Sequence, residues 1–336
     1  MTLANSLSKH ENELTALGIL SRTKTLVQPA LEAATQRLSL ELQPLVSHHL
    51  SAGGKYVRAC LALLSASAAG ADEHVGLVGA LAIEFVHNFS LIHDDIIDND
   101  VTRRHEPTVW AKYGVGPAII AGDALSTLAF QLLLEEPTVE HVRAARRLAD
   151  AIQAMVVGQA QDIASEHQLS LSVEECLHME AGKTGALLAC AASIGAVLAG
   201  ANDDVVNALS EYGDHLGLAF QATDDMLGVW GEPSITGKPV GNDLRLRKKT
   251  LPISIANAKG FDIFAKPSSS VEQELSDADV AEAMVLLEEC GARYETLELA
   301  EKELRAALEA LDRAPMASTA RDELAVIARY VIERDQ

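Results

Sequence analysis

Apolar residues recur at every third or fourth position along most of the chain, which is the spacing of a helix with a buried face. Pro29, Pro44 and Pro137 separate some of these stretches and are expected to start or break helices. The pattern predicts helices over residues 24–50, 59–70, 72–98, 117–135, 138–166, 172–200 and 203–230, and further helices after residue 254. No long stretch alternates polar and apolar residues as a strand does, so the fold class is all-α, one large helical bundle.

Three segments depart from this helical pattern. Residues 1–22 are polar and are expected to form an N-terminal arm or a short helix. Residues 231–252 combine Gly and Pro with a run of Lys and Arg, which predicts a basic loop. A polar gap around Pro267 follows, and Ser276 is expected to cap the next helix. None of these segments reads as a domain linker, so residues 23–336 are predicted to form a single domain.

The stretch from His87 to Arg104 opens as an apolar helix and runs into four aspartates. Asp94 and Asp98 are four residues apart, so on a helix they share one face. Like charges at this spacing oppose each other unless a cation lies between them. Because the preceding turns are apolar, a solvated acidic helix end is the weaker interpretation. A hard divalent cation with oxygen ligands, most simply Mg²⁺, explains the pattern better.

A second acidic pair, Asp224 and Asp225, follows Gln221 at helical spacing on another apolar helix. Two aspartate-bearing helices that are far apart in sequence indicate one site that both of them face. Polar residues also interrupt apolar helices at Gln159 to Asp162 and at Lys183 with Thr184. Burying an unpaired ammonium group is expensive, so Lys183 is a stronger candidate than an ordinary surface lysine.

Composition narrows the class of partner. The chain has 48 acidic and 27 basic residues, a net charge of −21, which makes nucleic acid or an anionic membrane surface an unsuitable partner. The four cysteines show no Cys-x-x-Cys spacing, which favours reduced thiols in a cytoplasmic protein. No apolar run reaches membrane-spanning length without a charged or polar break, so stable membrane insertion is not expected.

Isolated cations accompany the two acidic sites, and they stand out against the acidic average. They are Lys55 and Arg58 beside Gly53 and Gly54, Arg103 and Arg104, and Lys238 and Lys248 around the basic loop. Carboxylates alone repel a polyanion, whereas carboxylates with bound metals and added Lys and Arg suit a diphosphate. Taken singly, the basic residues read as solvated surface groups and His87 and Phe89 as core. Their conjunction with both acidic sites favours a diphosphate site.

These motifs resemble those of the trans-polyprenyl diphosphate synthases. Leu91 to Trp110 is similar to the family's first aspartate-rich motif, and Phe220 to Gly231, continued through Gly237–Arg245 and Lys248–Pro252, is similar to the second. Gly53–Arg58, Gly158–Asp162 and Lys183–Gly185 follow the family order, and the resemblance spans residues 25–335. Two residues, Ile96 and Ile97, separate Asp95 from Asp98 in the first motif, and His105 stands where Gly is usual. In both respects the sequence most resembles the geranylgeranyl-type synthases of actinobacteria.

The resemblance implies the isoprenoid synthase fold, an all-α bundle around a deep central cavity, usually as a homodimer. It implies that Asp94 and Asp98 bind two magnesium ions and Asp224 a third. The metals with Arg103, Lys183 and Lys238 would hold an allylic diphosphate, and Lys55, Arg58, His87 and Arg104 the diphosphate of isopentenyl diphosphate. Thr184 and Gln221 would line the region where the allylic cation forms, and Asp95, Asp225, Gln159 and Asp162 would support the site.

The implied activity is a chain-elongating prenyltransfer that joins isopentenyl diphosphate head to tail, in trans, to an allylic diphosphate. In this family the residues four and five positions before the first Asp, here Ser90 and Phe89, help to set the cavity floor. Aromatic Phe89 argues against very long products, whereas small Ser90 leaves depth. Geranylgeranyl diphosphate is therefore the expected product, with farnesyl diphosphate as the alternative.

Three other classes compete with this interpretation. Glu84 with His87 and Glu175 with His178 have the Glu-x-x-His spacing of di-iron carboxylate bundles, but a di-iron site explains neither acidic motif. A class I terpene cyclase would share the fold and the first motif, but the second motif has the transferase pattern. A non-catalytic subunit of a heteromeric synthase would have lost aspartates or basic contacts, and none is visibly lost.

Overall fold

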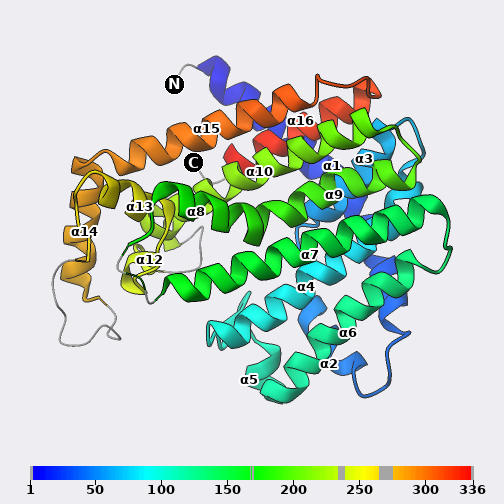
Figure 1. The fold of residues 1–336 in the computed structure, drawn as a ribbon, viewed down its shortest axis with the longest axis horizontal. Helices are drawn as coiled ribbons and strands as arrows, with labels where there is room; N and C mark the ends of the chain where they lie inside the picture. Colours follow the sequence, from blue (N-terminus) through cyan, green and yellow to red (C-terminus); the bar gives the residue numbers. More distant parts are fainter. Residues whose placement is uncertain (1–2, 167, 169, 234–238, 265–274, 334–336) are drawn as a thin grey trace. The chain divides into compact units, whose positions relative to one another are not determined.

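The computed structural model describes residues 3–333 except 167, 169, 234–238 and 265–274, and it is helical almost throughout (Figure 1). The described chain forms two compact units. Unit 1 comprises Met1–Ile152, Ala189–Ser210 and Leu311–Ile327, and unit 2 comprises Gln153–Leu188, Glu211–Ala310 and Ala328–Gln336.

The elements follow one another along the chain with short connections. The first part contains α1 (Leu3–Thr35), α2 (Gln43–Ser51), α3 (Val57–Ala68), the 3₁₀ turn η1 (Glu73–Gly76), α4 (Leu77–Ile97), β1 (Thr102–Arg103), β2 (Glu106–Pro107), α5 (Val109–Tyr113), α6 (Val115–Leu133) and α7 (Val139–Ser165). The second contains α8 (Val173–Glu180), the π-helical turn η2 (Ala181–Gly185), α9 (Ala186–Leu198), α10 (Asp203–Trp230), α12 (Asn242–Arg245), α13 (Leu251–Ala258), α14 (Asp277–Glu289), α15 (Ala292–Ala310) and α16 (Ser318–Glu333). The all-α prediction is confirmed.

Helix ends lie where local chemistry places them. Pro44 occupies the first turn of α2, where its missing N–H costs nothing. Ser276 caps α14 in a reciprocal capping box with Asp279, as expected. The prediction for Pro29 was wrong, because α1 continues through it. Pro29 is exposed there, so water can satisfy the carbonyl group that its missing N–H leaves.

Two further features differ from the sequence pattern. Thr102–Arg103 and Glu106–Pro107 pair as an antiparallel hairpin, which is too short for an alternating pattern to reveal. The helix predicted over residues 172–200 is interrupted by the π-helical turn η2. Apolar spacing did not reveal this turn, because residues 187–198 after it are buried at every position and so define no single face whose shift could be seen. Such π turns are frequent at functional sites.

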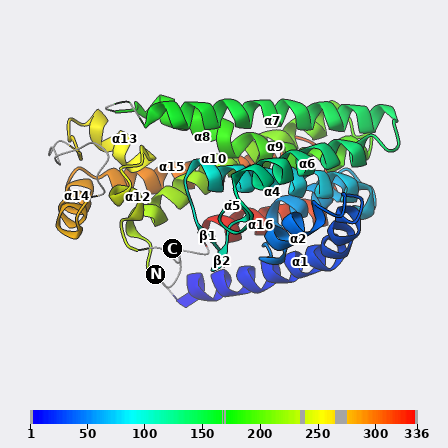
Figure 2. The same ribbon diagram turned by 90° about the horizontal axis from the view of Figure 1, so that it is seen from below.

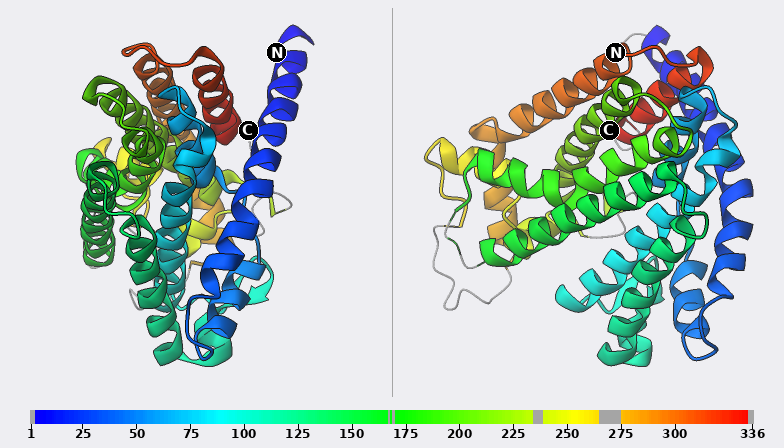
Figure 3. Two further views of the ribbon diagram at one scale, coloured as in Figure 1. Left: turned by 90° about the vertical axis from the view of Figure 1, so that its right-hand side faces the viewer. Right: turned by 45° about the vertical axis from the view of Figure 1, so that its right-hand side comes forward.

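Helix α4 is the centre of unit 1. It packs against α6 and α3, and α1 packs against α2, α3 and α4 (Figures 2 and 3). The interface is built from fully buried side chains such as Phe85, Ile92 and Leu125. Glycines allow some helices to approach without side chains between them, because a Cβ atom at Gly195 would lie 2.0 Å from the carbonyl oxygen of Ala62. The site residues of α4 therefore project from a tightly packed helix.

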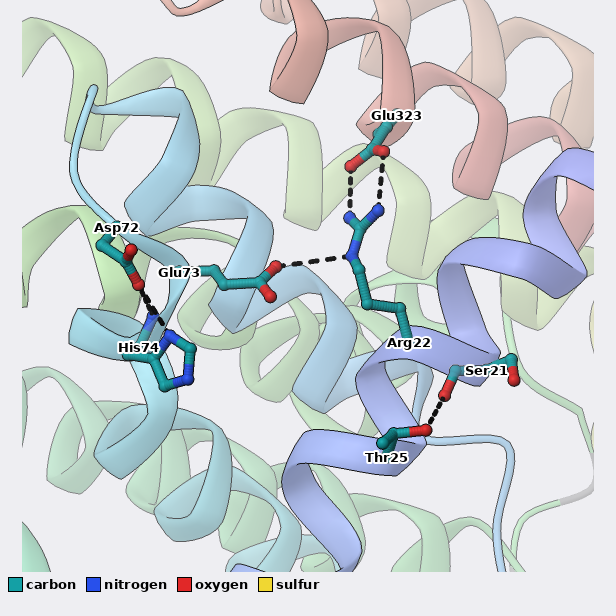
Figure 4. A network of polar contacts seen from close by, with 7 residues as sticks. All are labelled: Ser21, Arg22, Thr25, Asp72, Glu73, His74 and Glu323. Atoms are coloured by element: carbon teal, nitrogen blue, oxygen red, sulfur yellow. Dashed lines mark hydrogen bonds and ion pairs between the residues drawn. The ribbon is translucent and has the colours of Figure 1, made fainter.

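A polar network joins the N-terminal segment of unit 1 to its C-terminal segment (Figure 4). Arg22 of α1 donates to both carboxylate oxygens of Glu323 in α16, at 3.1 and 2.6 Å. Its Nε atom lies 3.5 Å from the carboxylate of Glu73 in η1. Because Arg22 is well exposed, this network fixes geometry more than it adds stability.

The core of unit 2 forms where α10, α13, α14 and α15 meet. Figure 1 shows α13 and α14 beside α15, and contacts join all three. Ala222 and Val229 of α10, Leu251 of α13, Leu287 of α14 and Ala300 of α15 are almost fully buried in one apolar cluster. This cluster anchors the half of α10 that carries the second acidic pair.

Within the described part of the chain, three helical stretches are long and apolar enough to cross a membrane, judged by length and composition. They are Glu73–Ile97, Val115–Leu133 and Val173–Leu198. The first and third are mostly buried within the protein, at 61% and 72% of their most apolar part, which explains their composition as core. Only 39% of α6 is buried on the same measure, so much of its apolar surface faces outward.

The close approach at Gly195 gives a stability prediction. Gly195→Ala places a methyl group against the backbone of α3, so we expect a loss of about 1–3 kcal/mol in the free energy of unfolding. Urea denaturation followed by circular dichroism measures this loss.

Gly18→Ala in α1 is the matched control, because nothing lies within 4 Å of a Cβ atom at that exposed position. It is expected to stabilise the protein by roughly 0.5–1 kcal/mol, since Ala loses less backbone freedom than Gly in a helix. Equal effects of the two changes would contradict the proposed packing.

Candidate active site

The first acidic motif lies at the C-terminal end of α4. Asp94 is half-buried, Asp98 is exposed at the C-cap, and the two lie one turn apart, as predicted. Asp95, on another face, is 1% exposed. The three carboxylates therefore divide into two near solvent and one in the protein interior.

Asp95 is tied to the β hairpin that follows α4. Its Oδ1 atom accepts hydrogen bonds from Nε and Nη2 of Arg103, both at 2.7 Å, while Oδ2 is buried without a hydrogen bond. Burial raises the pKa of Asp95, and Arg103 opposes that rise. Asp95 thus orients Arg103 and holds the hairpin against the end of α4.

The hairpin turn explains an unusual residue. Arg104 and His105 connect β1 to β2 with φ angles of +52° and +68°. A two-residue turn with both residues left-handed is the hairpin geometry that matches strand twist, and Gly is favoured in it. His105 therefore stands where Gly would fit without strain, at a backbone cost of about 1–2 kcal/mol. Its side chain is exposed.

A cationic cluster lies beside the first motif. Nη1 of Arg58 is 3.5 Å from Nε2 of His87, and Nε of Arg58 is buried without a hydrogen bond. Burial, followed by the positive charges of Arg58 and Arg104, holds the pKa of His87 well below its usual value. Burial also lowers the pKa of Arg58, and Glu84 opposes this. A partly desolvated guanidinium with an unused donor is suited to bind an anion.

The loop before α3 brings further groups to this cluster. Gly53 and Tyr56 have φ angles of +73° and +54°, which turn the chain sharply before the helix begins. A Cβ atom at Gly54 would lie 3.8 Å from Nη1 of Arg104, so the loop approaches that guanidinium closely. Lys55 is exposed on the same loop. The structure therefore brings this predicted loop next to the hairpin.

The second acidic motif lies on α10 in unit 2. Asp224 is exposed, whereas Asp225 is 4% exposed. Oδ1 of Asp225 accepts from the amide of Gln221 at 3.0 Å, and Oδ2 accepts from the backbone N–H of Leu251 at 2.8 Å. The hydroxyl of Thr184 donates to the other amide atom, Oε1 of Gln221, at 3.0 Å. One buried carboxylate thus connects α10, α13 and η2.

The π-helical turn places Lys183 beside α7. Its Nζ atom contacts Oδ2 of Asp162 at 2.5 Å. Gly158 makes this approach possible, because a Cβ atom there would lie 2.3 Å from the backbone nitrogen of Lys183. Gln159, from the same motif, is half-buried. The Gly-Gln-x-x-Asp and Lys-Thr motifs, separate in sequence, therefore form one contact.

Glu180 is a site residue that the sequence pattern did not reveal. It is 5% exposed, accepts a hydrogen bond from the thiol of Cys176 at 3.2 Å, and has an Oε2 atom buried without a hydrogen bond. Burial, followed by repulsion from Asp225, raises its pKa well above the usual value. The sequence feature that could have identified Glu180 is its position one helical turn before Lys183.

The basic loop is only partly described. Lys248 is exposed, and its backbone N–H donates to the carbonyl oxygen of Asp243 at 2.9 Å. Lys238, a predicted diphosphate ligand, lies outside the described residues.

The positions of the two Glu-x-x-His pairs argue against the di-iron interpretation. Glu175 is engaged in the capping box of α8 with Ser172, and His178 is exposed. Glu84 accepts from the backbone N–H of Ala59 at 3.2 Å. Among the described residues, no group of three or more His, Cys, Asp or Glu side chains converges as a metal cage.

Comparison with known proteins identifies the family. A model of the polyprenyl synthetase family matches residues 40–286. The (2E,6E)-farnesyl diphosphate synthase of Mycobacterium tuberculosis is 39% identical over 334 residues, covering 95% of this chain and 93% of the relative. The geranylgeranyl diphosphate synthase of the same organism is 38% identical over 308 residues, covering 87% and 88%.

A solved structure shows the same fold. The polyprenyl synthetase from Streptomyces coelicolor A3(2) matches with a TM-score of 0.88 and 46% identity, covering 94% of this chain and 99% of that one. The chain belongs to the polyprenyl synthetase family. It is a chain-elongating trans-prenyltransferase with the all-α isoprenoid synthase fold, acting on isoprenyl diphosphates with a divalent metal ion. The predicted family, fold and class of reaction are confirmed.

The residues present fit such a metal. Mg²⁺ usually binds proteins through one or two carboxylates and takes its remaining ligands from phosphate and water. Asp94 and Asp98, in unit 1, and Asp224, in unit 2, are the accessible carboxylates that would supply such ligands.

The raised pKa of Glu180 predicts a pH effect. Glu180 holds its proton in the folded protein at pH values where the unfolded chain has lost it, so its contribution is full below 4.5 and is lost as pH rises through the folded pKa. Glu180→Gln removes this loss, so the variant's stability relative to wild type is expected to rise as pH increases above 4.5. Thermal unfolding at several pH values measures the difference.

Glu175→Gln on the same helix is the matched control with the opposite sign. Hydrogen bonds from Ser172 lower the pKa of Glu175, so its contribution is present above 4.5 and is lost as pH falls through the folded pKa. This variant should be less stable than wild type near neutral pH and approach it in acid. Parallel curves for wild type and Glu180→Gln would show that Glu180 is ionised in the fold.

Proposed function

We propose that this enzyme condenses isopentenyl diphosphate with an allylic diphosphate, head to tail, and that geranylgeranyl diphosphate is its main product. The observation that supports this proposal most is that each acidic motif combines a buried aspartate with solvent-accessible ones. Asp95 and Asp225 are buried and hydrogen-bonded within the protein, whereas Asp98 and Asp224 are exposed and Asp94 is half-buried. The outer carboxylates are the proposed ligands of three magnesium ions.

The cations divide between two diphosphates in this proposal. Arg103, Lys183 and Lys238 hold the allylic diphosphate together with the metals, and Lys55, Arg58, His87 and Arg104 hold that of isopentenyl diphosphate. Support for the second group comes from the Arg58 and His87 contact and from the buried donor of Arg58. His87 is neutral near pH 7, because burial and the nearby arginines lower its pKa. Its Nε2 atom accepts from Arg58, so Nδ1 carries the proton and can donate to a diphosphate without adding charge. Lys248, which is exposed after α12, is a further proposed contact of the diphosphates.

The reaction follows from these positions. The allylic carbon–oxygen bond breaks and its electrons leave with diphosphate, whose charge the cationic side chains stabilise. Bound magnesium would supply further stabilisation of the same oxygens. The hydroxyl of Thr184 and the amide of Gln221 face the allylic cation. The double bond of isopentenyl diphosphate attacks this cation, and the proton then lost passes to the departing diphosphate, so no separate general base is required.

Product length depends on α4 in this proposal. Phe89 and Ser90 precede Asp94 by five and four residues, so they lie more than one turn from the reacting end. Phe89 is half-buried, and Ser90 donates to the carbonyl oxygen of His87 at 2.9 Å, which keeps its hydroxyl against its own helix. A single aromatic side chain at this floor supports a product of intermediate length, with farnesyl diphosphate as the alternative.

The outer apolar face of α6 supports a homodimer. Val115, Ile119 and Ile120 are 46%, 43% and 56% exposed and lie close together along the helix. A second copy packing against this face would remove it from water. We propose a cytoplasmic homodimer without stable membrane insertion.

The assignment of the acidic residues is tested by mutation. Asp94→Asn and Asp224→Asn are expected to lower kcat at least about 100-fold in the presence of magnesium, because each removes a charged ligand at the diphosphate. The measurement is elongation of dimethylallyl, geranyl or farnesyl diphosphate by labelled isopentenyl diphosphate. Asp204→Asn, exposed at the start of α10, is the control and should retain turnover. No elongation of any primer by the wild type would refute the function itself.

The proposed role of Phe89 at the cavity floor is tested separately. Phe89→Ala is expected to yield products at least one isoprene unit longer, because the ring that limits chain growth is removed. Chromatography of the hydrolysed products measures the distribution. An unchanged distribution would exclude Phe89 as the determinant of length.

A further inference from the structure

Two rings contact each other on α4 just before the first acidic motif. Phe89 and His93 lie four residues apart, with ring centroids 5.5 Å apart and planes at 86°. This edge-to-face geometry is the favoured arrangement for two rings and restricts how either can turn. His93 thus contacts the residue proposed to limit product length.

His93 is itself held from the opposite side by α6. Its Nε2 atom lies 3.1 Å from the carbonyl oxygen of Ile119, so Nε2 carries the proton and donates it. The carboxylate of Asp123 lies 3.9 Å from the same atom. The ring position is therefore set by the backbone of a second helix and not by α4 alone.

Gly122 provides the space that His93 occupies. A Cβ atom at Gly122 would lie 2.3 Å from Nε2 and 2.6 Å from Cδ2 of His93, which no real side chain tolerates. Gly122 is buried within α6 and is followed by an unbroken helix, so neither a turn nor a positive φ requires a glycine there. The absence of a side chain serves to admit the imidazole.

We propose that His93, seated at Gly122, is a positioning residue that fixes the ring of Phe89 and so narrows the range of product lengths. The inference rests on the proposed function, because it requires Phe89 to limit chain growth. A half-buried Phe on a helix has more than one allowed rotamer. When His93 blocks the alternatives, the floor has one depth. When the ring is lost, the floor has two depths and the enzyme releases two products.

The test compares product distributions in four variants. His93→Ala is expected to raise the ratio of the product one isoprene unit longer to the main product about fivefold, from the loss of one ring contact. His93→Gln keeps a donor for Ile119 but lacks the ring, so the same rise is expected. Gly122→Ala displaces His93 and should act likewise. Phe89→Ala combined with His93→Ala should match Phe89→Ala alone, because His93 acts through Phe89.

Gly18→Ala on α1 is the control, because that glycine is exposed and nothing lies within 4 Å of a Cβ atom there. It should leave the product distribution unchanged. The KM values of Gly122→Ala for both substrates should stay within about twofold of wild type, since no residue that holds a diphosphate is altered. Thermal unfolding of each variant verifies the fold, and if Gly122→Ala or His93→Ala is unfolded or inactive, His93→Gln decides.

The outcomes separate the inference from the proposed function. If Phe89→Ala lengthens the products while the His93 and Gly122 variants give the wild-type distribution, the role of His93 is refuted and the function stands. If Phe89→Ala changes nothing, the assignment of the floor fails first. If Gly18→Ala broadens the products as much as Gly122→Ala, the space at Gly122 is not the cause.

Discussion

A buried carboxylate is costly unless hydrogen bonds replace the water that it loses, and this constraint organises both acidic motifs. Asp95 is held by Arg103 of the hairpin, and Asp225 by Gln221 and the backbone N–H of Leu251. Asp95 thereby joins α4 to the hairpin that follows it, and Asp225 joins α10 to α13, which is separate from it in chain order. The outer aspartates of the same helices keep their exposure because the inner ones bear the structural role.

Close backbone approach is the second constraint. The Lys-Thr motif reaches α7 because Gly158 leaves room for the backbone of Lys183, and the π turn η2 presents both Lys183 and Thr184 to their partners. In unit 1 Gly122 admits His93 in the same way. These glycines matter because they have no side chain, which leaves room for Lys183 and His93 to pack closely against the helices.

Helical periodicity was sufficient to predict most elements, because one face of nearly every helix is buried and the apolar spacing records that face. Asp94, Asp98 and Asp224 were recognisable for the same reason, since charge on an otherwise apolar stripe conflicts with burial. The π turn, the hairpin turn at His105 and the continuation of α1 through Pro29 left no such record. They depend on backbone contacts and solvent exposure, which do not alter the apolar spacing.

The sequence by itself determined the fold class, the family and the identity of the charged residues, because periodicity and motif order are local properties. Only the tertiary structure decided which aspartate of each pair is buried, that burial beside Asp225 raises the pKa of Glu180, and that Arg58 contacts His87. Those properties depend on desolvation and on the distance between groups from different helices. Neither quantity exists until the helices pack.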